Sequence, residues 1–113
     1  MTGVWESETC PVYKAVIYIA GNYEDILREC KNYCTETSYC VSTIRADFPY
    51  KYGCEEGAAV TLINYARFPD EEDTILWRAR QLALRLAEKL NQGSYTIVGA
   101  KDSTYYSRRG DLK

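Results

Sequence analysis

The fold is decided by the stretch VYKAVIYIA, residues 12–20. Nearly every residue in it is apolar, and most are β-branched or aromatic, which predicts a central β-strand that is covered on both faces or nearly so. Gly21 ends this strand, and Asn22 is suited to cap a helix whose apolar residues recur at helical spacing to about Thr37.

The remaining segments complete an alternation of strands and helices. The sequence pattern predicts two strands at residues 40–48 and 58–65, separated by a turn at 49–53. It predicts the longest helix at residues 69–93 and two short strands at 95–98 and 104–107. The order β-α-β-β-α-β with a small C-terminal hairpin predicts a ferredoxin-like α+β fold, in which two helices cover one face of an antiparallel sheet.

The chain of 113 residues is short enough to form a single domain. Residues 1–10 show no helical or strand periodicity, and we expect them to form an N-terminal arm. We expect residues 11–113 to form a single ligand-binding α+β domain. The second face of the sheet would remain uncovered and rich in apolar and tyrosine side chains. We therefore expect a homodimer or a higher homo-oligomer.

Composition argues against several classes of protein. The sequence has no histidine, which removes the usual general base and the commonest metal ligand, although carboxylates and tyrosines can also carry out acid-base chemistry. A net charge of -2 argues against a nucleic-acid polymer as partner. No apolar run is long enough to cross a membrane, and no signal peptide is present, so we expect a cytoplasmic protein.

Five cysteines are numerous for this length, but their spacing does not match a structural zinc site. Cys30 and Cys34 are one helical turn apart among apolar residues, and we interpret them as free thiols packed in the core. No phosphate-binding glycine loop or dinucleotide fingerprint occurs. We expect neither a metal nor a cofactor.

The C-terminal segment STYYSRRG is the first candidate binding site. Tyr105 and Tyr106 can stack on a nucleobase, and Arg108 and Arg109 can hold phosphate oxygens. The alternative is an edge strand whose tyrosines pack and whose arginines keep the edge soluble.

The second candidate is the loop between a strand and the longest helix. Asn64, Arg67 and Phe68 belong to it, and the following helix N-terminus offers free N–H groups to an anion. Alternatively, Arg67 pairs with the acidic residues that begin the helix. Trp77, on the outer or flanking side of that helix, indicates an interface or a stacking platform, or is a partly buried surface residue.

Acidic residues also flank a tyrosine-rich loop. Asp47, Glu55 and Glu56 could form a glycosidase-like carboxylate pair, but nothing in the sequence fixes their separation. We interpret them as solvated loop residues and expect no catalytic residue.

Four segments carry a family resemblance: IYIAGNYEDI (17–26), GAAVTLINYARFP (57–69), QGSYTIV (92–98) and TYYSRR (104–109). Together they resemble the first described anti-Thoeris family of bacteriophage proteins. The resemblance implies a non-enzymatic sponge in the host bacterial cytoplasm, which sequesters a cyclic ADP-ribose isomer or another cyclic nucleotide and so inhibits Thoeris defence. It also implies dimers that assemble further.

Two other functions remain open. The chain could mask a host protein through its tyrosine-rich surface without any small ligand. It could also be an enzyme that degrades a cyclic nucleotide, which the lack of histidine disfavours.

Overall fold

The computed structural model describes residues 3–112. Its elements follow the predicted order, including the fifth strand of the predicted C-terminal hairpin. They are β1 (Lys14–Ala20), α1 (Tyr23–Thr37), β2 (Ser42–Tyr50), β3 (Gly53–Ile63), α2 (Glu72–Lys89), β4 (Ser94–Val98) and β5 (Ser103–Ser107).

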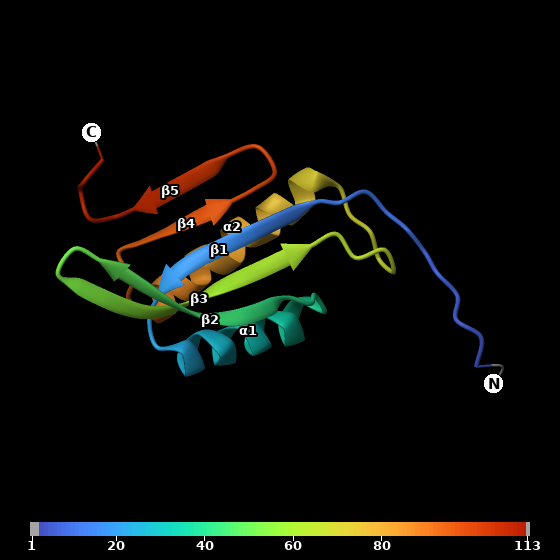
Figure 1. Ribbon diagram of the computed structural model, residues 1–113, viewed down its shortest axis with the longest axis horizontal. Coiled ribbons are helices and arrows are strands. Elements are labelled where there is room, and N and C mark those ends of the chain that lie inside the picture. Colours follow the sequence, from blue (N-terminus) through green and yellow to red (C-terminus); the bar gives the residue numbers. More distant parts are fainter. Residues whose placement is uncertain (1–2, 113) are drawn as a thin grey trace.

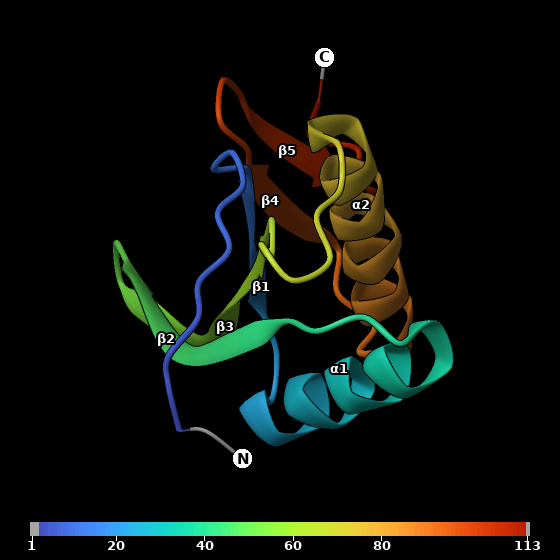
Figure 2. The ribbon, with the colours of Figure 1, turned by 90° about the vertical axis from the view of Figure 1, so that its right-hand side faces the viewer.

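The five strands form one sheet in the order β2-β3-β1-β4-β5, and all neighbouring strands are antiparallel. Both helices lie on the same face of this sheet (Figures 1 and 2). The predicted ferredoxin-like α+β fold is therefore confirmed, and β4 with β5 forms the predicted C-terminal hairpin.

The core lies between the helices and one face of the sheet. Ala15, Ile17 and Ile19 of β1 are fully or almost fully buried there, whereas Tyr18 on the other face is 41% exposed. Within the single chain, the prediction that β1 is covered on both faces or nearly so is wrong, because both helices pack on the same side. Its apolar residues on the second face are consequently left in contact with solvent.

The helices follow their sequence signals. Asn22 caps α1 by accepting a hydrogen bond from the backbone N–H of Asp25, as predicted. Burial raises the pKa of the Cys30 thiol on the core side of α1 to about 12, which keeps this thiol protonated as a small apolar side chain.

The β2–β3 hairpin differs from the prediction. The predicted turn began at Pro49, but Pro49 continues β2 and pairs with Cys54, so the turn lies at Lys51 and Tyr52. An edge strand accommodates proline because one side of its backbone needs no ladder hydrogen bond. As a result the hairpin extends beyond the last β1–β3 pair, Ala20 with Gly57.

Residues 3–13 belong to no helix or strand, and the Trp5 side chain is 97% exposed. Residues 1 and 2 of the predicted arm, and the last residue of the predicted domain, lie outside the described residues. Neither helix in the described part of the chain has the combination of length and apolar character needed to cross a membrane.

Candidate functional site

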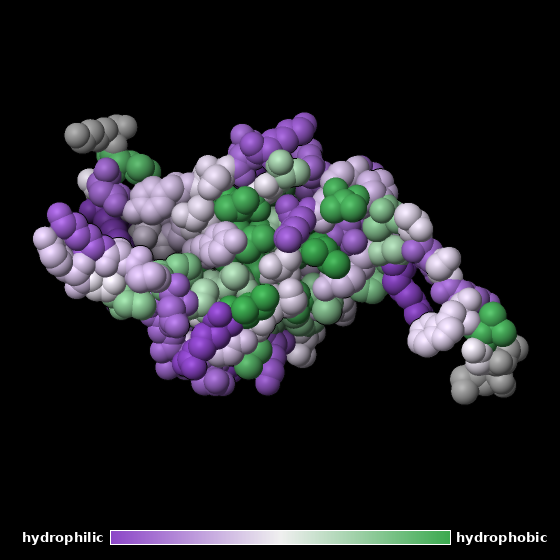
Figure 3. All heavy atoms as spheres, in the orientation of Figure 1, coloured by the Kyte–Doolittle hydropathy of each residue, from purple (hydrophilic) through white to green (hydrophobic). Residues whose placement is uncertain are grey.

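The face of the sheet without helices, here called the open face, carries a row of aligned side chains. Tyr18 of β1 is paired with Thr96 of β4, and Thr96 is paired with Tyr105 of β5. On the other side of Tyr18, the row continues through Ala59 to Ile44, which is 65% exposed. Figure 3 views this face and shows hydrophobic residues distributed over the strands.

A pocket of about 200 Å³, here called the sheet-end pocket, lies where β1 ends and the β2–β3 hairpin extends past it. It brings together aromatic, acidic and basic side chains from strands that are far apart in sequence. It is lined by Tyr18, Ile19, Ala20, Phe48, Glu55, Ser94, Tyr95, Thr96, Tyr105 and Arg109.

Gly57 allows Phe48 to reach this pocket. A Cβ atom at position 57 would lie 2.2 Å from the Ile19 carbonyl oxygen and 2.7 Å from the Phe48 ring. The lack of a side chain therefore lets β1 approach β3 closely and lets the ring lie over the strand.

Arg109 depends on a second glycine in a similar way. A Cβ atom at Gly93 would lie 2.6 Å from Nε of Arg109, so the arginine side chain passes directly over this residue. Within the described chain, the Arg109 guanidinium makes no ion pair. It is therefore available to a ligand anion.

The two neighbouring glutamates of β3 have different environments. Glu56 accepts hydrogen bonds from the Arg45 side chain and from the Tyr23 backbone N–H, and these bonds lower the pKa of its carboxyl group. Glu55 is on the opposite face of the strand, and its side chain makes no ion pair or hydrogen bond with another described residue. Glu56 thus stabilises the hairpin, whereas Glu55 supplies an unpaired carboxylate to the pocket.

The C-terminal residues are bound to the pocket wall. The Tyr105 hydroxyl donates to Oδ2 of Asp111 at 2.7 Å, and the Ser107 hydroxyl donates to Oδ1 at 2.6 Å. These two bonds lower the pKa of Asp111, Ser107 having the larger effect.

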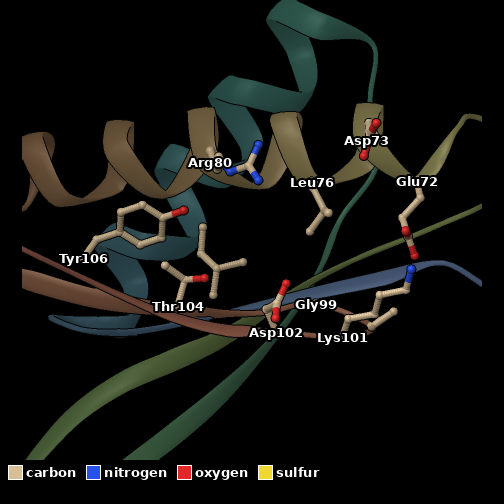
Figure 4. Close-up of a pocket in the computed structure, with 11 residues that line it drawn as sticks. Glu72, Asp73, Leu76, Arg80, Gly99, Lys101, Asp102, Thr104 and Tyr106 are labelled. Carbon is tan, nitrogen blue, oxygen red and sulfur yellow. The ribbon is translucent and has the colours of Figure 1, made fainter.

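A larger cavity of about 340 Å³ lies between α2 and the β4–β5 hairpin. Figure 4 shows Glu72 pointing from α2 toward Lys101 of the hairpin, with Asp102 close to Lys101. Tyr106 is the only aromatic residue that lines this cavity in the described chain. Its charged lining offers less stacking surface for a nucleoside than the sheet-end pocket does.

The sheet-end pocket contains two of the eight predicted binding residues, Tyr105 and Arg109. Their neighbours Tyr106 and Arg108 lie on the helix side, because side chains alternate along a strand. Tyr106 stacks on Tyr95 with 5.1 Å between ring centroids, and Arg108 donates to the Ala87 carbonyl at 3.4 Å.

The other predicted residues are distant from this pocket. Asn64, Arg67 and Phe68 follow the end of β3 that pairs with the start of β1, at the opposite end of the sheet. Trp77 lies on α2 and is 51% exposed. No ion pair joins Arg67 to the acidic residues at the start of α2 in the described chain.

Sequence reasoning missed Tyr18 and Phe48 and interpreted Glu55 as a solvated loop residue. The alternation of β1 could have signalled Tyr18, which is the aromatic residue between Ile17 and Ile19. Phe48 and Glu55 gave no comparable signal, because their position depends on how far the hairpin extends past β1.

No family model matches this chain, and no curated protein matches it significantly. Two solved structures are similar to it. A phage SAM lyase in the apo state has a TM-score of 0.70 and 15% identity, over 86% of this chain and 90% of that chain. A phage SAM lyase in complex with S-methyl-5'-thioadenosine has a TM-score of 0.69 and 13% identity, over 97% and 100% of the two chains.

These comparisons correct the sequence analysis. Both similar structures are of phage proteins, as the resemblance to a phage family implied, but they do not confirm the anti-Thoeris family. The prediction that the chain is not an enzyme is contradicted, because both structures are of a lyase. At these identities, the similarity shows that the chain has the fold of phage SAM lyases.

Proposed function

We propose that this chain is a lyase that cleaves S-adenosylmethionine (SAM) and releases S-methyl-5'-thioadenosine. The observation that carries the proposal is the sheet-end pocket, which combines aromatic rings with the Glu55 carboxylate and the Arg109 guanidinium, neither of which has an ion-pair partner among the described residues. The fold supports it, since a structure with the same fold binds S-methyl-5'-thioadenosine.

The lining of the pocket matches the chemical groups of SAM. Rings such as Tyr18 and Tyr105 can stack on adenine and attract the sulfonium cation through their faces. Glu55 can attract the sulfonium or the ammonium group, and Arg109 can hold the methionine carboxylate in a bidentate manner.

Cleavage requires no water and no metal. The bond between sulfur and the aminobutyryl Cγ breaks, and both electrons go to sulfur, which leaves as a neutral thioether. In one balanced route the substrate carboxylate attacks Cγ and forms a lactone. In the other, Glu55 removes a Cβ proton and a carbon–carbon double bond forms.

We further propose that a second copy of the chain covers the open face. The volume of the sheet-end pocket, about 200 Å³, is below the roughly 300–1,000 Å³ typical of ligand sites. Exposed apolar residues lie on the same face, among them Ile44 in the row of Tyr18 and Ile63 at the opposite end of the sheet. A homo-oligomer would both bury these residues and enclose the substrate.

In this proposal the protein acts in the cytoplasm of a phage-infected bacterium. Removing SAM would deprive host defence enzymes of a cofactor or methyl donor. The cyclic ADP-ribose isomer expected from the resemblance contains the same adenosine unit. The isomer is therefore a suitable ligand to test for competition with SAM in binding to the sheet-end pocket.

The test is to incubate the purified protein with SAM and to quantify S-methyl-5'-thioadenosine and the four-carbon product by mass spectrometry. Glu55→Gln should lower kcat by about 100-fold or more if Glu55 is the base, because general-base catalysis typically contributes about 10²–10⁴. Glu56→Gln is the matched control and should retain turnover within about twofold, because its carboxylate is on the other face of β3.

Each product identifies a route. The lactone and the unsaturated amino acid are isomers of equal mass, and SAM that carries two deuterons at Cβ distinguishes them, because the lactone keeps both deuterons and the unsaturated amino acid keeps one. If the lactone forms, Glu55→Gln should mainly raise KM. Intact SAM recovered only after denaturation of the protein would contradict the proposal and indicate sequestration. Unchanged kcat together with unchanged KM in the Glu55→Gln variant would remove Glu55 from the site.

A further inference from the structure

We infer that Asp111 is a positioning residue that fixes the substrate-facing wall of the sheet-end pocket. This inference rests on the proposed function, because it concerns the same pocket. Asp111 follows the last strand and does not line the pocket. It acts through Tyr105 and through the turn that carries Arg109, and we call these residues, 105–111, the C-terminal latch.

The geometry of the latch uses both oxygens of one carboxylate. Tyr105 and Ser107 are two residues apart on β5, so their side chains project from the same face of the strand. Asp111 accepts a hydrogen bond from each hydroxyl, at 2.7 Å and 2.6 Å. Hydrogen bonds to a charged acceptor are stronger than neutral ones and more geometrically restrictive.

The same network reaches Arg109. Its backbone N–H donates to Oγ of Ser107 at 3.1 Å, which ties the residue that bears the guanidinium to the Asp111 carboxylate. Gly110 has a φ of 77°, a conformation that glycine adopts readily, and it turns the chain so that Asp111 can reach back to β5. One side chain thus sets the position of two pocket residues.

The latch also assigns a role to Tyr105. Its hydroxyl is occupied by Asp111, so the residue offers its ring to the ligand. The ring is 41% exposed and has Thr96 beside it on β4, and the bond to Asp111 is the hydrogen bond that its hydroxyl makes within the described residues. Tyr105 therefore provides a stacking surface that depends on Asp111.

A double-mutant cycle tests the inference. Asp111→Ala should raise KM for SAM about tenfold and leave kcat within about twofold, because stacking binds the substrate without taking part in bond cleavage; tenfold corresponds to about 1.4 kcal/mol. In the Tyr105→Phe background the same substitution should raise KM by clearly less, because the partner hydroxyl is absent. Asp111→Asn should partly restore KM, since its amide oxygen can accept one of the two bonds.

Asp102→Asn is the matched control, because Asp102 is at the opposite end of the same hairpin and its side chain has no hydrogen bond to a described residue. It should leave KM unchanged. If the wild-type protein cleaves SAM but Asp111→Ala does not alter KM, the latch is wrong and the proposed function stands. If the effects of Asp111→Ala and Tyr105→Phe on the free energy derived from KM are additive, the two side chains do not act together, and the inference about the latch is overturned.

Binding of S-methyl-5'-thioadenosine, measured by calorimetry, separates the two proposals further. If the wild-type protein binds this nucleoside without cleaving SAM, the lyase proposal fails. The double-mutant cycle of Asp111→Ala and Tyr105→Phe then still tests the latch, with the Kd for the nucleoside measured in place of KM. If the wild-type protein neither cleaves SAM nor binds this nucleoside, both proposals are overturned.

Discussion

Asn64 is a buried residue whose side chain joins three segments of the chain. Its Nδ2 donates to the Pro11 carbonyl at 2.9 Å, and its Oδ1 accepts from the Asp70 backbone N–H at 2.8 Å. Sequence position alone suggested a ligand-binding residue, because Asn64 begins a loop before a helix. In the structure its polar groups hold the entry to β1 and the approach to α2.

We expect Asn64→Ala to lower the free energy of unfolding by about 1–3 kcal/mol, because it removes two part-buried hydrogen bonds to backbone groups and a buried side chain. Chemical denaturation measures this change. Asn32→Ala, at an exposed position on α1, should change stability by less than about 0.5 kcal/mol. Unchanged stability in Asn64→Ala, with weakened ligand binding, would instead support the ligand-binding prediction.

At the scale of elements, the contact between β1 and β3 depends on Gly57. We expect Gly57→Ala to destabilise the protein by about 1–3 kcal/mol, because the new methyl group would collide with a backbone oxygen that cannot rotate away. Substrate affinity should fall as well, since Phe48 would be displaced.

Gly99→Ala is the corresponding control for Gly57→Ala. Its nearest obstacle is the flexible Leu76 side chain at 3.1 Å, so a smaller loss of stability is expected. Thermal unfolding and SAM binding of the two variants measure both effects. Equal losses of stability and of SAM affinity in the two variants would show that β1 and β3 can pack this closely with a side chain at position 57.

At the scale of the whole molecule, the open face predicts self-association. We expect the wild-type protein to sediment at a multiple of 13.0 kDa, and Ile44→Glu to dissociate it and reduce turnover, because a charge would be buried in the interface. Leu84→Glu is the matched control, since Leu84 is 52% exposed on α2, away from the open face. A wild-type monomer with full activity would contradict the proposed interface.

Both helices and the overall order of elements could be predicted from the sequence, because their signals are local. Asn22 marks the start of α1, and the acidic residues of α2 stand where the helix dipole favours them. The apolar stretch around β1 likewise identified the central strand. Boundaries were less accurate at Pro49, where only the pairing with Cys54 shows that the strand continues.

The sequence by itself determined the ferredoxin-like α+β architecture and the chemical character of the C-terminal segment, because periodicity, caps and residue types act over a few neighbouring positions. Only the tertiary structure decided which residues form a site. Tyr18, Glu55 and Arg109 are far apart in the chain, and they meet because strand register and the extension of the β2–β3 hairpin place them at one end of the sheet. Such long-range pairing depends on the packing of the whole sheet, so no local pattern encodes it.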